Sequence, residues 1–158
     1  MIKKNIDVPE IGLNKTLETG LQITINYILP LNSLNKLTNL LGKVIEIENS
    51  PKLEYDNFWV THLPSWFVKK SKNYTEEDLI SNTQLWEFGS WVDSIKQRGW
   101  KWWEYKELDN NSIIYLETFT FPYNIDSFFY MLYCVGVDIK NIEIIEIFPN
   151  SSNLKVVK

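Results

Sequence analysis

The stretch that decides the fold is SIIYLETFTFPYNIDSFFYMLYCVGVDIKNIEIIEIFPNS, residues 112–151. Its first part, 113–121, predicts a strand because β-branched and aromatic residues predominate. Pro122 ends the strand, and a helix follows that closes at Gly136, a residue suited to the left-handed position after a helix. The helix turns four apolar side chains inward, those of Ile125, Phe128, Phe129 and Leu132. The segment 142–148 then predicts a closing strand.

The segment 21–51 repeats the same order of elements. Alternation from Leu21 to Leu29 predicts a strand, Pro30 follows, leucines at helical spacing lead to Gly42, and Val44 to Glu48 predicts a second strand. Two such units predict an α+β fold, a ferredoxin-like mixed β-sheet with both helices on one face and right-handed crossovers. Because 158 residues suit one ordinary domain, we expect a single domain.

An insertion, roughly 53–108, separates the two units and holds all seven tryptophans. These are Trp59, Trp66, Trp86, Trp91, Trp100, Trp102 and Trp103. We expect a strand at 57–63, an irregular basic loop at 64–74 and a helix over 75–97, with Gly89 as an alternative break in that helix. The insertion is therefore helical at its centre.

Two local patterns anchor this insertion. Thr75 with Asp78 approximates a capping box and predicts the start of the helix. The segments 101–108 and 112–121 predict a hairpin across 109–111, whose Asp and Asn residues tolerate the positive φ of a tight turn. The hairpin ties the tryptophan-rich insertion to the sheet.

The second predicted helix is apolar almost all round, because Tyr130, Met131, Tyr133 and Cys134 occupy its back. An apolar back needs a cover. The tryptophan-rich insertion is the natural lid, and a homodimer interface is the alternative. Cys134 is expected to be a small buried side chain rather than a nucleophile.

Charge and composition narrow the function classes. The net charge is −4, and fifteen lysines accompany a single arginine, Arg98, which opposes nucleic-acid binding. The longest apolar run, 128–137, is half the length of a membrane span. Residues 1–12 lack a signal-peptide pattern, and the one cysteine suits a reducing compartment, so we expect a cytoplasmic protein without a membrane partner.

The sequence contains few residues that could act in catalysis or bind a metal ion. One histidine, His62, and one cysteine do not supply a zinc or iron site, and we expect no cofactor. The best enzymatic alternative is a cleft where Glu117 pairs with Glu107 or Glu104 beside Trp103, which would also suit glycans. An inward glutamate is more often structural.

The candidate partner-binding face follows from strand alternation. On the strand 101–108, Trp102 shares a face with Glu104 and Lys106, away from Trp103. Glu46 and Glu48 point together on their predicted strand and would extend this acidic, aromatic surface. Aromatic side chains dominate binding hot spots.

In general profile the chain resembles immunity proteins, which protect bacteria from toxins delivered by their neighbours. The likeness lies in a compact acidic chain that lacks a catalytic signature and has the composition of A- and T-rich coding DNA. It implies a protein that binds a partner, a basic toxin, directly and carries over no individual residue. A glycan-binding protein or enzyme, and a structural or dimerisation module, are the alternatives.

Overall fold

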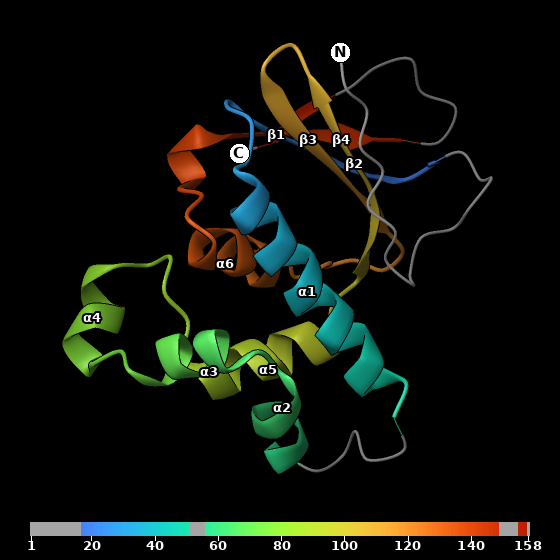
Figure 1. The fold of residues 1–158 in the computed structure, drawn as a ribbon. Helices are drawn as coiled ribbons and strands as arrows, with labels where there is room; N and C mark the ends of the chain where they lie inside the picture. The colour runs from blue at the N-terminus through green and yellow to red at the C-terminus, as the bar shows by residue number, and fades with distance from the viewer. Residues whose placement is uncertain (1–16, 51–55, 149–154, 158) are drawn as a thin grey trace.

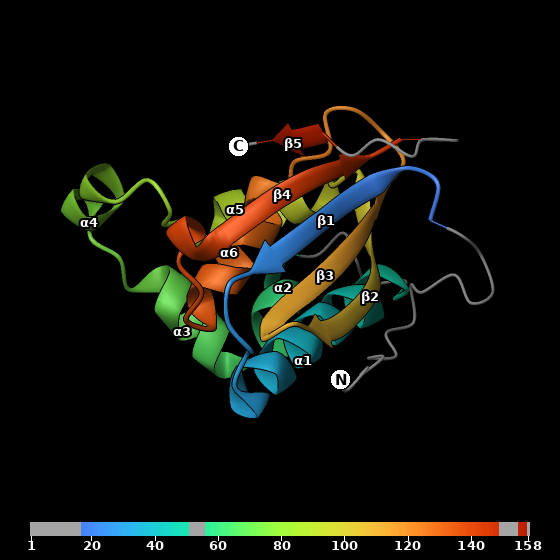
Figure 2. The same ribbon diagram turned by 90° about the horizontal axis from the view of Figure 1, so that it is seen from above.

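The protein is a mixed α+β structure in which helices lie on one face of a β-sheet (Figures 1 and 2). The computed structural model describes residues 17–50, 56–148 and 155–157. In chain order the elements are β1 Gly20–Ile25, α1 Leu31–Glu48, α2 Asp56–His62, α3 Ser65–Lys72, α4 Glu76–Ser81, α5 Phe88–Lys96, β2 Trp100–Leu108, β3 Asn111–Thr118, α6 Asp126–Cys134, a short 3-10 helix Ile139–Asn141, β4 Ile142–Ile147 and β5 Lys155–Val157.

The sheet has the strand order β2-β3-β1-β4-β5, and each neighbouring pair is antiparallel. The prediction of a mixed sheet is therefore wrong. The β2–β3 hairpin places β3, not β2, beside β1, and the connection through α6 brings β4 to the other side of β1 (Figure 2). Strands that run parallel are thus always separated by an antiparallel one.

The element order of the second predicted unit is confirmed within the described residues, as β3, α6 and β4. The predicted end of its first strand at Phe121 is wrong, because β3 ends at Thr118 and Phe121 is exposed. Gly136 takes a φ of 97° at the end of α6. Its N–H donates to the Tyr133 carbonyl at 3.0 Å, and the Val137 N–H donates to the Leu132 carbonyl at 2.9 Å. This pair of bonds satisfies carbonyls that the helix end leaves open. The end of the unit, 149–151, lies outside the described residues.

The predicted hairpin is also confirmed. Asp109 and Asn110 have φ values of 52° and 65°, the two positive values that a tight two-residue turn between twisted strands requires. The alternation along β2 is broken by a bulge, since the pairing register shifts between Trp102 and Glu104. Trp103 is the extra residue, and every side chain after it changes face.

The first predicted unit is wrong in its second half, because α1 runs on through Glu48 where a strand was expected. Apolar residues continue at helical spacing past Gly42, so a longer helix buries them without a new strand. Its buried residues are Leu34, Leu37, Leu40, Leu41, Val44, Ile45 and Ile47. Gly42 lies inside the helix rather than at its cap.

Replacing Gly42 with alanine is expected to raise the free energy of unfolding by about 0.5–1 kcal/mol, the usual gain within a helix. A Cβ added there meets no atom within 4 Å. Chemical denaturation measures the change. Gly20→Ala is the contrasting variant, because its Cβ would collide with the Leu116 carbonyl oxygen and should destabilise. Destabilisation by Gly42→Ala would contradict the continuous helix.

Between α1 and β2 the described part of the middle segment forms four helices and no strand, so two further predictions are wrong. The expected strand at 57–63 is α2, in which Phe58 and His62, four residues apart, stack at 3.7 Å. The expected loop at 64–74 contains α3, whose N-cap is Pro64. Proline suits a helix start because no N–H is needed there. Packing of Trp59, which is fully buried, outweighs the strand propensity of α2.

The predicted helix over 75–97 is two helices, α4 and α5. The capping box of Thr75 and Asp78 is confirmed, with bonds of 2.9 and 3.0 Å in the two directions. Glu87 begins the second helix by accepting from the Gly89 and Ser90 N–H groups. These bonds lower the pKa of Glu87, so the cap stays charged.

The tryptophan-rich segment covers the back of α6, as expected. The Tyr130 hydroxyl lies 2.7 Å from that of Ser71, and the Trp91 indole N–H donates to the Ser127 carbonyl at 3.1 Å. Phe67 packs between them, with ring centroids 4.6 Å from Trp91 and 5.7 Å from Tyr130. The chain therefore buries Tyr130 by itself.

Candidate functional site

Trp102 is not a surface residue, which corrects the centre of the predicted binding face. Its side chain is 0% exposed, as are those of Trp100 and Tyr105. The bulge after Trp102 explains the error, because it lets residues 102 and 105 share the inner face where strict alternation would separate them. Trp102 packs near Phe128 of α6, with centroids 6.4 Å apart.

Glu46 and Glu48 do not point together, because they lie on a helix. Two residues along a helix are about 200° apart around its axis. Glu46 is exposed and forms a 3.4 Å ion pair with Lys43, whereas Glu48 accepts from Arg98 at 2.6 Å. Glu46 and Glu48 therefore do not extend the predicted acidic surface.

Glu104 and Lys106 are half-buried residues of β2. The Lys106 ammonium lies 5.0 Å from the centre of the Tyr115 ring on the neighbouring strand. Such contacts hold a lysine at exposed sites with modest energy. These two residues remain available to a partner, but the aromatic anchor expected between them faces the core.

Of the alternative acidic cleft, Glu107 does not reach Glu117, whereas Glu104 pairs with Tyr115, two residues from Glu117 on the same face of β3. Glu117 pairs in register with Lys101 at one end of the hairpin, and Glu107 pairs with Ser112 near the turn. Five residues of strand separate Glu117 from Ser112, about 17 Å. Glu107 accepts a 3.0 Å hydrogen bond from Tyr105, whose pKa burial raises to about 12. Trp103 is half-buried at the bulge.

The nucleophile and metal candidates are likewise separate. The exposed His62 ring lies 3.0 Å from the Phe58 carbonyl and from the Thr61 hydroxyl. Burial raises the pKa of Cys134 to about 11, which keeps the thiol protonated. Among the described residues, no three acidic, histidine or cysteine side chains converge as metal ligands would. Over the same residues, no helix has the length and apolarity to cross a membrane.

Cys134 is expected to react with iodoacetamide about a hundredfold more slowly below pH 9 than an ordinary thiol, because its pKa rises from 9.0 to about 11. Mass spectrometry with and without denaturant measures this, with Cys134→Ser as the blank. The folded chain holds the proton more tightly, so the thiol's contribution to stability is full below pH 9 and is lost as the pH rises through about 11. Equal rates in folded and unfolded chains would contradict this.

An acidic arm projects from the body of the protein. We use this name for α4, which stands away from the other helices (Figure 1). Glu76, Glu77 and Asp78 form its first turn, none of its residues is buried, and Ile80 is 75% exposed. Acidic residues in a first turn interact favourably with the helix dipole, and the Thr75–Asp78 capping box stabilises the same end of α4.

An aromatic groove of about 540 Å³ begins where the chain leaves the arm. It lies between the 83–86 connection and α6. Its lining residues are Thr83, Gln84, Leu85, Trp86, Asp126, Phe129, Tyr130 and Ile139. Gln84 fixes its far wall by accepting from the Ile139 N–H at 3.2 Å, and Asn82 donates to the Tyr133 hydroxyl at 3.4 Å. The arm and the groove are adjacent along the chain: the acidic first turn begins α4, and the groove lining starts just after α4 ends.

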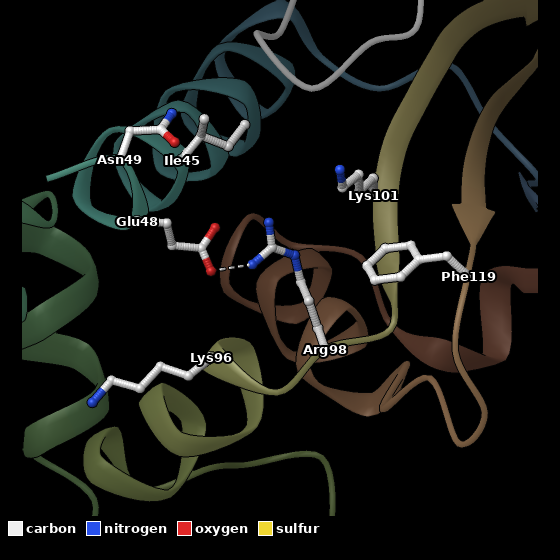
Figure 3. Close-up of a pocket in the computed structure, with 7 residues that line it drawn as sticks. All are labelled: Ile45, Glu48, Asn49, Lys96, Arg98, Lys101 and Phe119. Atoms are coloured by element: carbon white, nitrogen blue, oxygen red, sulfur yellow. Dashed lines mark hydrogen bonds and ion pairs between the residues drawn. The ribbon is translucent and has the colours of Figure 1, made fainter. Parts of the chain in front are cut away.

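A second hollow, of about 400 Å³, lies between the end of α1 and the start of β2 (Figure 3). We call it the Arg98 pocket. The Arg98 side chain extends into it from the α5–β2 connection and meets Glu48 of α1, with Phe119 on the opposite side. The full lining is Ile45, Glu48, Asn49, Lys96, Arg98, Lys101 and Phe119.

The sequence patterns predicted the start of α4 but neither its exposure as a separate helix nor the groove. Thr75 followed by three acidic residues, the last of which completes the capping box, is the pattern that could have indicated an exposed helix. Its apolar residues are too few to form a buried stripe. The groove has no comparable pattern, since its walls come from three separate stretches of chain. Comparison with models of protein families, with curated proteins and with solved structures found no match.

Proposed function

We propose that this protein binds a basic protein partner through the acidic arm and the aromatic groove, and that it acts as an immunity protein that neutralises a toxin. The observation that carries the proposal is the arm, a helix that buries none of its residues and presents Glu76, Glu77 and Asp78 beside an exposed Ile80. A short helix without buried side chains adds little to a core. The three carboxylates of the arm suit electrostatic contact with a basic partner.

The groove supplies the second element of the proposed interface. Trp86 and Phe129 are half-buried in its wall, and Asp126 is exposed at its edge. Rigid aromatic side chains anchor interfaces and slow dissociation, whereas the carboxylates of the arm accelerate encounter with a basic surface. The division of roles predicts an association rate that depends on salt and a dissociation rate that depends on the groove.

The proposal includes the finer features expected from the sequence. The strand order β2-β3-β1-β4 with an α6 crossover supports a ferredoxin-like fold whose first crossover is the tryptophan-rich segment. One cluster of buried side chains that includes sheet and helices supports a single domain, 1–158. A single cysteine in the sequence, which rules out an internal disulfide, is compatible with the proposed cytoplasmic location.

The proposal requires a toxin gene beside this one, and the test pairs the full chain with the product of that gene. Association is measured by stopped-flow fluorescence at low and high salt. Glu76→Lys/Glu77→Lys should slow association about tenfold at low salt, because it reverses the charge that steers encounter, and the difference should shrink at high salt. The matched control is Glu46→Lys/Glu143→Lys, which makes the same change in net charge at exposed positions outside the arm.

A growth assay completes this test. Cells that lack the gene should be inhibited by the toxin, and the full chain should restore growth. If deletion of the gene leaves growth in the toxin's presence unchanged, the immunity function is wrong. If both charge-reversed variants bind alike, the arm is not the interface.

A further inference from the structure

The single arginine of the chain, among sixteen cationic residues, lies in the wall of the Arg98 pocket. Its side chain is 5% exposed, and its guanidinium reaches the hollow (Figure 3). Arginine differs from lysine in presenting a planar fork of donors that matches the oxygens of a carboxylate or phosphate. All other cationic side chains of the sequence are lysines, and the one guanidinium group lies at a hollow.

The guanidinium is held in a fixed orientation. Its Nη1 donates to Glu48 at 2.6 Å and to the Ile95 carbonyl at 3.1 Å. The guanidinium carbon also lies 5.1 Å from the centre of the Trp100 ring. Donors fixed before a ligand arrives lose less entropy on binding. Glu48 therefore acts as a positioning residue for the arginine.

The rim of the pocket adds a second cation and an aromatic wall. The Lys101 ammonium lies 5.4 Å from the centre of the Phe119 ring, and Phe119 is 51% exposed. The Lys96 ammonium points away from Arg98 (Figure 3) and lies 5.8 Å from the Trp59 ring. Within the described lining, Arg98 and Lys101 carry two positive charges toward the hollow, and Glu48 carries one negative charge.

We propose that the Arg98 pocket binds a small organic oxyanion. Its phosphate or carboxylate head lies between the Arg98 guanidinium and the Lys101 ammonium, and its apolar body lies along Phe119. The hollow of about 400 Å³ exceeds what an inorganic anion fills, so the body contributes to binding. This site goes beyond the proposed partner-binding function and lies on other elements.

The test titrates the full chain, at constant ionic strength, with phenyl phosphate, phenylacetate and inorganic phosphate. Binding is followed by NMR on the Arg98 Nε–H and the Trp100 indole N–H signals. We expect saturable shifts with an aromatic anion, and weaker binding of inorganic phosphate. Comparison of phenyl phosphate with phenylacetate identifies which head group the site prefers.

Lys101→Met should weaken binding about tenfold, as the loss of one charge-assisted contact implies. Lys106→Met is the matched control, because Lys106 also lies on β2 and over an aromatic ring but outside the lining. It should bind as the unchanged chain does. Arg98→Lys keeps the charge without the fork and should weaken binding further.

Absence of saturable shifts with all three anions would overturn the proposal. Equal affinities for the Lys101→Met and Lys106→Met variants would overturn it as well, since binding would then depend on general charge. Because neither outcome involves the toxin or the arm, failure here leaves the immunity function standing.

Discussion

Trp102→Ala should lower the free energy of unfolding by about 3–5 kcal/mol, the usual cost of removing a buried tryptophan from a core. The side chain is 0% exposed and faces Phe128 of α6 across the sheet–helix interface. Its removal leaves a cavity that the neighbouring rings cannot close without moving. Urea denaturation followed by circular dichroism measures the change.

Trp103→Ala is the matched control for this variant, since the two tryptophans are adjacent and Trp103 is half-buried at the bulge. Its cost should be clearly smaller. Equal costs, or a larger cost at residue 103, would mean that the bulge does not place Trp102 in the core. Strict strand alternation would then describe β2 better.

Glu48→Gln should destabilise the chain by about 2–3 kcal/mol. The substitution leaves the Arg98 guanidinium, 5% exposed, without its carboxylate at 2.6 Å. Loss of one partner from a fully buried ion pair costs about 3–5 kcal/mol. The cost is lower here because the Glu48 side chain retains 24% exposure, so water screens part of the charge. The same denaturation experiment measures it.

Glu46→Gln is the control for this carboxylate. Glu46 forms its ion pair at the surface, with side-chain exposures of 42% for Lys43 and 65% for Glu46, and such pairs contribute about 0–1 kcal/mol. We therefore expect little change. If Glu48→Gln is equally mild, the Arg98 pair does not join α1 to the α5–β2 connection.

Local chemistry predicted the second half of the fold well. Gly136 and the Asp109–Asn110 turn require backbone geometries that few other residues tolerate, so their positions in the sequence mark the end of α6 and the turn between β2 and β3. Pro122 lies beyond the end of β3 at Thr118 and is a less exact signal. The first half lacked such signals. The sequence from Val44 to Glu48 fits either a strand or a continuation of α1. The helix forms because it buries Val44, Ile45 and Ile47.

The candidate site was the least predictable feature. One extra residue in β2, Trp103, exchanged the faces of the strand, and a single sequence does not show a bulge that contains no glycine. The groove depends on how residues 83–86 meet α6 and Ile139, which only the packed chain determines. In contrast, the capping box at Thr75 correctly marked the start of the arm.

β1 lies at the centre of the sheet but is synthesised before both strands that pair with it. Gly20 pairs with Glu117 on one side and with Ile147 on the other. Synthesis at about 5–20 residues per second therefore leaves β1 without either neighbour for roughly 5–20 s. During that interval α1, the first long helix to be synthesised, is the element that can cover the apolar face of β1. The nascent chain therefore depends on α1 until the other strands are available for pairing.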